Sequence, residues 1–421
     1  MNPRSVDTTE RPVVLIWELT QACELACKHC RADATPNRHP EELTTTEGKQ
    51  LLDSARTFSD NQLVVLSGGD PLARDDVKDL VAYGTDIGLR MTLTPSGTSS
   101  LTPSRVQALA DAGLRRLAVS IDGGSAATHD AFRGESGSFE QTREAITAAK
   151  AAGLPVQINT TVCAETVDEL PAIRDLVADV GAVLWSVFFL VPVGRGRVLT
   201  PISPKRAETV MEWLHTVSTE ASFGIKTTEA PHYRRVAATN ASAATPPPQA
   251  TDTVDRERGV TAGNGFAFVS HRGEVYPSGF LPQSAGSVRE TDIVEIYRES
   301  DLFRSLRQPD ALGGKCGACE YQHICGGSRS RAFAYTGDPL AADPLCAYVP
   351  AAYDGPLPAH PMADRTESAV DSCWPTRKTN DQRGTLVTVP PRRWVPRLPS
   401  RRSPHKRPGS NRKNSSMHTV A

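Results

Sequence analysis

The sequence predicts an α/β fold in which helices alternate with the strands of a parallel sheet. Two observations indicate this class: six apolar, strand-like segments recur along the first half of the chain, and a segment of helical periodicity follows each of the first five. Such alternation is typical of a parallel sheet with helical crossovers, either an open doubly wound sheet or part of a barrel. In both arrangements, functional groups belong just past the carboxyl ends of the strands.

The expected strands are buried apolar runs, which lie at Pro12–Leu19, Gln62–Leu66, Arg90–Leu93, Arg116–Ile121, Val156–Val162 and Leu184–Val191. The helices between them are expected at Thr44–Phe58, Asp75–Ile87, Thr102–Ala112, Phe139–Ala152 and Val167–Val180. The first helix has a start signal, because Thr44 to Thr46 offer an N-cap and Glu47 places an acid in the first turn.

The pattern changes in the second half of the chain. Lys205–Ala221 reads as a helix, and the Ala-, Thr- and Pro-rich stretch Asn240–Gly265 as an insertion or mobile loop. Phe266–Val269 and Glu274–Tyr276 are expected to form a β-hairpin, followed by a helix over Ile293–Leu306. From Pro356 onward Pro, Arg and Ser dominate, and we expect a disordered tail.

Composition narrows the class of protein. The 421 residues suffice for two or three domains, and the net charge of −1 conceals a basic tail with 13 Lys and Arg against 4 Asp and Glu from Gly355 onward. We expect this tail to be solvated rather than to contact RNA or anionic surfaces, and the mildly acidic body argues against a nucleic-acid partner. The longest apolar run, Val183–Val193, is too short to span a membrane, and Met1–Pro12 lacks a signal-peptide pattern. A cytoplasmic protein without a membrane partner is expected.

Seven of the nine cysteines fall into two groups, Cys23, Cys27 and Cys30 near one end and Cys316, Cys319, Cys325 and Cys346 in the second half. Clustered thiols in a reducing compartment indicate metal rather than disulfides. Three thiolates would leave one iron of a 4Fe–4S cubane open to another ligand, whereas four complete the set for one 4Fe–4S cluster or one zinc. Of the other two cysteines, Cys163 is expected to be a buried core thiol, and Cys373 lies in the tail without an assigned role.

The three-cysteine loop after the first strand, together with Gly68-Gly69-Asp70-Pro71 after the second, resembles the radical S-adenosylmethionine (SAM) superfamily over Val13–Val191. The resemblance implies a partial (β/α)6 TIM-like barrel. It also implies a 4Fe–4S cluster on Cys23, Cys27 and Cys30, whose open iron is chelated by SAM. Two positions depart from the family pattern. His29 stands where an aromatic ring usually packs over the cluster, and Asp70 stands where Glu is more common.

Further SAM contacts follow from the same resemblance. The residues implied to bind SAM lie at strand ends or in the motif before Gly134, namely Gly68, Gly69, Asp70, Pro71, Ser96, Ser120, Asp122, Arg133 and Asn159. The apolar segment Leu190–Val193 would lie beside the adenine. Taken singly, Ser120 or Asn159 is more often an ordinary hydrogen-bonding residue at a strand end, and Asp70 alternatively caps the following helix.

The second cysteine group resembles the SPASM/twitch extension of peptide- and cofactor-maturing members. Ser278 stands where that extension usually has a Cys after Tyr276-Pro277, and a further Cys is missing from the segment 326–329. The resemblance therefore implies one auxiliary 4Fe–4S cluster on Cys316, Cys319, Cys325 and Cys346, with a structural zinc as the alternative. The expected organisation is a radical SAM core over residues 12–200, a helix and Pro-rich linker over 201–265, an auxiliary cluster domain over 266–353 and a basic disordered tail over 354–421.

The resemblance implies an enzyme that reductively cleaves SAM to a 5′-deoxyadenosyl radical, with an external one-electron reductant such as flavodoxin or ferredoxin. The radical abstracts hydrogen from the substrate, and no catalytic residue is expected beyond the cofactors. The segments Cys325–Ala334 and Asp343–Cys346 resemble haem-biosynthesis members, which act on propionate or related side chains of a tetrapyrrole. Maturation of a ribosomally made peptide is the alternative substrate class, although few residues precede the first strand to form a peptide-binding domain. A non-catalytic iron–sulfur scaffold is the third interpretation.

Two basic segments have competing interpretations. Arg195, between Gly194 and Gly196, is expected either to bind a substrate carboxylate through its guanidinium or simply to cap the sixth strand. The cluster Pro231–Arg235 combines an imidazole, a phenol and two guanidinium groups. It is a candidate substrate-contacting loop, but a solvated surface is the favoured interpretation.

Overall fold

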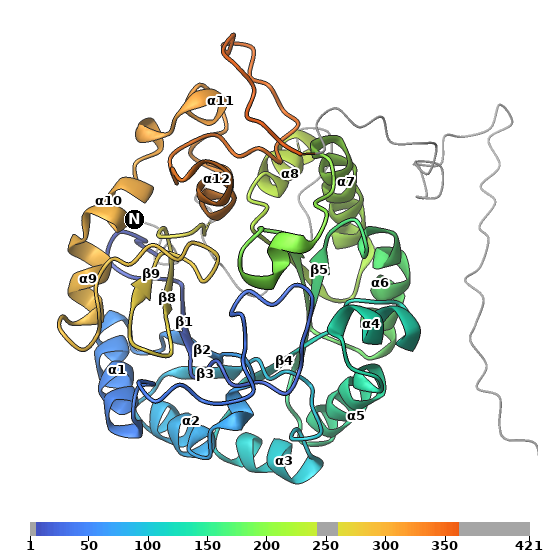
Figure 1. Ribbon diagram of the computed structural model, residues 1–421, viewed down its shortest axis with the longest axis vertical. Coiled ribbons are helices and arrows are strands. Elements are labelled where there is room, and N and C mark those ends of the chain that lie inside the picture. Colours follow the sequence, from blue (N-terminus) through green and yellow to red (C-terminus); the bar gives the residue numbers. More distant parts are fainter. Residues whose placement is uncertain (1–5, 242–259, 362–421) are drawn as a thin grey trace, which may run out of the picture. The chain divides into compact units, whose positions relative to one another are not determined.

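The computed structural model describes residues 6–241 and 260–361, and these residues form a curled sheet of nine strands (Figure 1). The spatial order is β7-β6-β5-β4-β3-β2-β1-β8-β9, and every neighbouring pair is parallel except the antiparallel pair β8 and β9. The strands are β1 (Val14–Glu18), β2 (Leu63–Ser67), β3 (Arg90–Leu93), β4 (Arg116–Ser120), β5 (Val156–Val162), β6 (Leu184–Phe189), β7 (Gly224–Thr228), β8 (Phe266–Val269) and β9 (Val275–Tyr276). Because β7 and β9 are not paired with each other, the barrel is open.

All six strands expected from the sequence are present, and the α/β partial-barrel class is confirmed. The helices that follow them surround the outer side of the sheet in Figure 1. They are α1 (Thr45–Phe58), α2 (Val77–Asp86), α3 (Pro103–Asp111), α5 (Ser138–Ala151), α6 (Leu170–Asp179) and α7 (Pro204–Glu220). The first begins as expected, because Thr44 and Glu47 form a reciprocal capping box that satisfies backbone N–H groups at the helix start.

Several elements differ from the expectation. The predicted hairpin joins the main sheet, since β8 pairs in parallel with β1. In this register Val14 lies opposite Phe266, and Trp17 lies opposite Val269. The single helix expected over Ile293–Leu306 is two helices, α9 (Ile293–Glu299) and α10 (Asp301–Leu306). The break lies at Ser300, which leaves the helical conformation and accepts a hydrogen bond from the Phe303 N–H, so that it caps the second helix. Strand β7 and helix α4 (Ala126–Arg133) were not predicted.

The two faces of the sheet differ in chemistry. On β6, Trp185 points outward, where its ring packs edge-on against Trp213 of α7 at 6.1 Å between ring centroids. The alternate residue Ser186 points to the inner face, where its hydroxyl lies 3.4 Å from the hydroxyl of Thr228 on β7. The apolar core therefore lies between the sheet and the outer helices, and polar side chains line the inside of the half-barrel.

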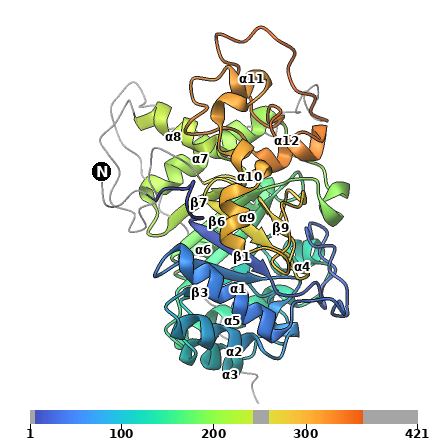
Figure 2. The ribbon, with the colours of Figure 1, turned by 90° about the vertical axis from the view of Figure 1, so that its left-hand side faces the viewer.

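The remaining helices are α8 (Tyr233–Ala241), α11 (Gly314–Gly317) and α12 (Arg329–Thr336). Figure 2 shows them gathered at one end of the described part of the chain, near α7. No helix of this part is long and apolar enough to cross a membrane. Residues 242–259 of the predicted linker and residues 362–421, which include Cys373 and most of the predicted tail, lie outside the described residues.

Candidate active site

The loop between β1 and α1 carries the first three cysteines and crosses the centre of the half-barrel in Figure 1. Cys23 and Cys27 are buried together with Leu25, and Cys30 and Ala34 pack against them. The loop is held by its own backbone, since the N–H of Cys23 donates to the carbonyl of Thr35 at 2.8 Å and the N–H of Cys30 to that of Cys27 at 3.3 Å. The structure thus brings together the three thiols that the sequence identified as one group.

The Gly68-Gly69 turn at the end of β2 packs directly on this loop. A Cβ atom on Gly69 would lie 2.5 Å from the carbonyl oxygens of both Gln21 and Ala22, so no side chain fits there. The Asp70 N–H donates to the carbonyl of Ala22 at 2.7 Å. The glycines therefore allow the end of β2 to approach the backbone next to Cys23.

Arg195 has a role that sequence reasoning did not assign. Its Nε donates to the carbonyl of Cys27 at 3.0 Å and its Nη1 to the carbonyl of Ala34 at 2.9 Å. Gly194 precedes it with a φ of 53°, and a Cβ at Gly194 would lie 2.5 Å from the carbonyl oxygen of Cys30. Arg195, in the short 3-10 segment Gly194–Val198, thus fastens the cysteine loop to the end of β6. This contact is more than the simple cap expected for it, and the substrate-carboxylate role stays a prediction, since the buried Nη2 of Arg195 has no hydrogen-bond partner.

Arg133, the last residue of α4, lies beside the three cysteines. It is 6% exposed, pairs with Asp122 Oδ2 at 3.4 Å and donates to the carbonyl of Ser96 at 3.1 Å. Its buried Nε has no hydrogen-bond partner. Burial alone would lower the pKa of Arg133. The thiols of Cys27 and Cys23 and the carboxylate of Asp122 raise it by more, so the net change is an increase. A buried guanidinium with an unused N–H fits an anionic ligand next to this loop.

Ser96 and His29 lie next to the same cysteines. The hydroxyl of Ser96 lies 3.3 Å from the sulfur of Cys23 and donates to the carbonyl of Gly69 at 2.6 Å. The ring of His29 stacks on that of Phe132 at 4.8 Å between centroids. Burial lowers the pKa of His29 to about 4, so the imidazole is neutral near pH 7.

Asp70 is buried and already engaged within the fold. Its Oδ1 accepts a hydrogen bond from the Leu72 N–H at 3.0 Å and thereby caps the 3-10 helix Pro71–Ala73. Its Oδ2 accepts from the hydroxyls of Thr98 at 2.9 Å and Ser100 at 3.3 Å. The capping role that the sequence left open is therefore present in the structure, and a carboxylate with about four acceptor positions retains one of them.

The other predicted SAM residues lie on the inner side of the sheet or just past its strands. Ser120 and Asn159 are register partners on β4 and β5, and Asn159 Oδ1 accepts from the Gln157 side-chain amide at 2.8 Å. Asp122 accepts from the Thr161 N–H at 2.7 Å in addition to its pairing with Arg133. Burial alone would raise the pKa of Asp122. The neighbouring His29 and Arg133 lower it by more, so the net change is a decrease. Together with the cysteine loop, these residues occupy the carboxyl ends of adjoining strands.

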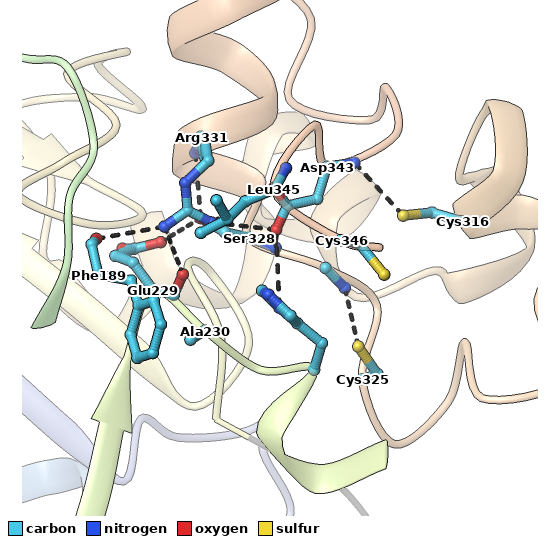
Figure 3. A network of polar contacts seen from close by, with 12 residues as sticks. Phe189, Glu229, Ala230, Cys316, Cys325, Ser328, Arg331, Asp343, Leu345 and Cys346 are labelled. Atoms are coloured by element: carbon cyan, nitrogen blue, oxygen red, sulfur yellow. Dashed lines mark hydrogen bonds and ion pairs between the residues drawn. The ribbon is translucent and has the colours of Figure 1, made fainter. Parts of the chain in front are cut away.

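The second cysteine group lines one pocket. Cys316 on α11 and the loop residues Cys319, Cys325 and Cys346 surround it, together with the cationic side chains of Arg235 and Lys315. The Asp343 N–H donates to the sulfur of Cys316 at 3.4 Å, and the Gly327 N–H to the sulfur of Cys325 at 3.4 Å (Figure 3). N–H donors and nearby cations fit thiolate ligands of an iron–sulfur cluster.

Neither cysteine group amounts to a completed metal centre. Across residues 6–241 and 260–361, no group of three or more His, Cys, Asp or Glu side chains is arranged to hold a metal ion. Burial raises the pKa of the Cys346 thiol to about 12 and also raises that of Cys325.

Arg331 connects the second cysteine pocket to the barrel. This side chain on α12 is fully buried and pairs with Asp343 at 3.1 Å. It also donates to the carbonyl of Phe189 at the end of β6 at 3.2 Å and to that of Glu229 after β7 at 2.7 Å (Figure 3). A further bond goes to the carbonyl of Leu190 at 3.2 Å. From the sequence, Arg331 was expected only as part of the segment Cys325–Ala334, because nothing in its local pattern distinguishes a buried guanidinium from an exposed one.

The cluster Pro231–Arg235 is not the solvated surface that the sequence favoured. His232 is fully buried, with its Nδ1 3.9 Å from Asp343 Oδ2, and burial lowers its pKa to about 4. Arg235 lies at the second cysteine pocket and pairs with Glu208 of α7 at 2.6 Å. The error arose because distant segments supply the partners of these cations: Arg234 donates to the carbonyls of Ile324 and Val260, and Arg235 pairs with Glu208.

Comparison with known proteins identifies the family to which this chain belongs. Residues 17–177 match the radical SAM superfamily. The chain is 42% identical over 357 residues to the AdoMet-dependent heme synthase of Nitratidesulfovibrio vulgaris, covering 83% of this chain and 96% of that protein. It is 30% identical over 357 residues to the mycofactocin maturase MftC of Mycobacterium tuberculosis, covering 82% and 86%.

Solved structures show the same fold. Streptococcus suis SuiB bound to its precursor peptide SuiA has a TM-score of 0.63 at 16% identity, covering 80% of this chain and 76% of that chain. The chain belongs to the radical SAM superfamily and is an enzyme. Within the superfamily its sequence is similar to members of haem biosynthesis, and membership implies SAM and a 4Fe–4S cluster as cofactors.

Proposed function

We propose that this enzyme abstracts hydrogen from a propionate side chain of a tetrapyrrole, in haem biosynthesis. The observation that carries the proposal is the 42% identity to an AdoMet-dependent heme synthase, which extends over 96% of that protein. The identity to the peptide-modifying relative is lower, at 30%. A substrate rich in carboxylates also suits a half-barrel whose inner face is polar.

In this proposal, Cys23, Cys27 and Cys30 hold the cluster that binds SAM. When bound, cluster and SAM supply a 5′-deoxyadenosyl radical, formed as one electron from a reductant such as flavodoxin or ferredoxin breaks the bond between sulfur and C5′. The chain's own residues position SAM and exclude water. Arg133 donates its unused Nε–H to the carboxylate of SAM. Asp70 accepts a hydrogen bond from the ammonium of SAM at its remaining acceptor position.

The remaining contacts proposed for SAM come from the strand ends. Gly69 carries the backbone carbonyl next to Asp70, and Ser120 and Asn159 face the inside of the barrel from neighbouring strands. The family pattern assigns such groups to the ribose and other polar parts of SAM. The buried apolar segment around Leu190 and Val191 is proposed to flank the adenine.

The second cysteine group is proposed to hold an auxiliary 4Fe–4S cluster. Four protein thiolates would leave no iron open to the substrate, so the role proposed is electron transfer from the substrate radical, or structural support. The N–H donors to Cys316 and Cys325 support this choice, because they stabilise thiolate charge. A structural zinc on the same cysteines is the alternative.

The test uses the full chain reconstituted anaerobically with iron and sulfide. A tetrapyrrole deuterated on its propionate side chains is supplied with SAM and a one-electron reductant, and 5′-deoxyadenosine is analysed by mass spectrometry. We expect deuterium in the 5′-deoxyadenosine and a modified tetrapyrrole. Formation of 5′-deoxyadenosine without deuterium, at the same rate with and without the tetrapyrrole, would contradict the proposed substrate.

Peptide maturation is the second candidate, favoured by the identity to the mycofactocin maturase over 86% of its length. The same assay distinguishes the two, because a peptide substrate would transfer deuterium from a labelled peptide and none from the tetrapyrrole.

A further inference from the structure

Lys226 is a cationic side chain on the inner face of the half-barrel that the roles described so far do not use. It lies on β7, two residues before Thr228, and Thr228 faces Ser186 across the inner surface at 3.4 Å between hydroxyls. Because side chains alternate along a strand, Lys226 shares this face. Lys226 could not be placed from the sequence, because β7 itself was not expected.

The strand register places Lys226 in one row with two of the predicted SAM residues. Ser120 of β4 pairs with Asn159 of β5, Asn159 with Ser186 of β6, and Ser186 with Lys226 of β7. Neighbouring strands lie about 4.8 Å apart, so the backbone of Lys226 is roughly 10 Å from that of Asn159. A lysine side chain spans much of this distance. The ammonium is therefore within reach of a substrate that lies next to SAM.

The ammonium of Lys226 is unpartnered. Within residues 6–241 and 260–361 it makes no hydrogen bond or ion pair, and the residue is exposed to solvent. Its pKa is lowered by desolvation and by the positive charges of Arg116 and Arg234. Two neighbouring cations disfavour an isolated ammonium and favour one that is paired with an anion.

We propose that Lys226 binds a carboxylate of the substrate and thereby helps to select it. This inference rests on the proposed function, in which the substrate carries propionate groups. One propionate would pair with Lys226, while the side chain to be attacked lies beside SAM. The two cations that act on Lys226 are engaged elsewhere, since Arg234 donates to the carbonyls of Ile324 and Val260 at 3.3 Å each and Arg116 donates to the side chain of Gln157 at 3.4 Å.

The test measures binding of an iron porphyrin with four propionate side chains to the reconstituted, SAM-loaded full chain. The change of the porphyrin absorbance reports the dissociation constant. For Lys226→Met we expect it to rise about ten- to a hundredfold, because a charge-assisted hydrogen bond to the carboxylate is lost. Lys226→Arg retains the charge and should bind within about threefold of wild type. Lys205→Met, an exposed position on α7, is the matched control and should bind like wild type.

A second probe isolates the carboxylate. The tetra-amide of the same porphyrin should bind equally weakly to wild type and Lys226→Met, because it offers no anion. Equal affinity of wild type and Lys226→Met for the tetrapropionate would overturn the role of Lys226 and leave the proposed function standing. Failure of the wild-type protein to bind the tetrapropionate would overturn the proposed function together with this inference.

Discussion

The two cysteine groups are held in place by different means. The first lies within eight residues of one loop, and close packing of the Gly68-Gly69 turn and Gly194, with the guanidinium of Arg195, fastens the backbone of that loop to the strand ends. The second is spread over residues 316–346, and its connection to the barrel includes the buried pair of Arg331 and Asp343. Close backbone packing positions the first group, whereas a buried charge pair positions the second.

The surroundings of the thiols do not distinguish the two groups. Backbone N–H groups donate to two sulfurs in each, at 3.3 and 3.5 Å to Cys23 and Cys30 and at 3.4 Å each to Cys316 and Cys325. Buried nitrogens without a hydrogen-bond partner also lie beside both groups, the Nε of Arg133 at the first and the Nε of Arg235 at the second. The number of thiols does distinguish them, because three thiolates leave an iron open to SAM in the proposed cluster and four thiolates close the other.

The largest effect is expected from removing one cysteine of each group. Reconstituted wild type should bind about eight irons per chain, and Cys27→Ala or Cys316→Ala about four each. Cys27→Ala should form no 5′-deoxyadenosine, whereas Cys316→Ala should still cleave SAM when no substrate is present. Analysis of iron, zinc and sulfide measures the metal content of each protein, and chromatography of 5′-deoxyadenosine measures SAM cleavage. About four irons and one zinc in wild type would replace the auxiliary cluster by a zinc site.

The buried pair gives the next largest effect. Arg331→Met leaves Asp343 fully buried without its cation, and such changes cost about 3–5 kcal/mol. The free energy of unfolding, from denaturant titration, should fall by that amount, and the second cysteine group should lose its metal before the first. Arg143→Met removes an exposed pair with Glu140 at 3.7 Å and should cost less than about 1 kcal/mol. Equal effects of the two variants would show that Arg331 does not position the second group.

His129 makes the first region sensitive to pH. Its ring is fully buried and accepts a hydrogen bond from the Asp122 N–H at 3.2 Å. Burial lowers its pKa from 6.5 to about 4, despite the opposing charge of Asp122. Between those values the unfolded chain binds the proton and the folded chain does not. The free energy of unfolding should therefore decrease as the pH falls from 6.5 to 4, by roughly 3 kcal/mol from this group.

His129→Gln retains a hydrogen-bond acceptor but does not titrate, so it isolates this contribution. The nearby Asp122, Asp130, Arg133 and His29 remain in both proteins and cancel in the comparison. Denaturant unfolding at several pH values should give a shallower slope for the variant between pH 6.5 and 4. Parallel slopes in the two proteins would show that His129 is already protonated in the folded state.

The comparison also explains what the sequence could predict. The first site was predictable because its determinants are local: three closely spaced cysteines, two glycines before Asp70 and polar residues at strand ends. The second cysteine group was recognised from spacing, but its positioning by Arg331 was not. A buried charge pair depends on partners such as Asp343 and the carbonyl of Leu190, which only the folded chain brings together. Strand β7, and with it Lys226, escaped because its five residues, Gly-Ile-Lys-Thr-Thr, are half polar.

The smallest effect, and the sharpest, concerns Asp70. Asp70→Asn should preserve the fold, because Asn caps about as well as Asp and its carbonyl oxygen can still accept from the Leu72 N–H. The hydroxyls of Thr98 and Ser100 can rotate to accept from the new amide. What the variant lacks is negative charge. If the remaining acceptor position receives the SAM ammonium, SAM affinity should fall about ten- to a hundredfold at unchanged iron content.

Thr98→Val is the matched control for Asp70→Asn, since it removes a hydrogen bond to the same carboxylate and leaves its charge. It should lower the unfolding free energy by about 1 kcal/mol and change SAM affinity by less than about threefold. Asp70→Glu should be mild, because it keeps the charge and restores the residue more common in the superfamily. Equilibrium binding of SAM to the cluster-loaded proteins measures all three variants. Unchanged affinity in Asp70→Asn would leave Asp70 as the cap of the Pro71–Ala73 helix and remove it from the SAM site.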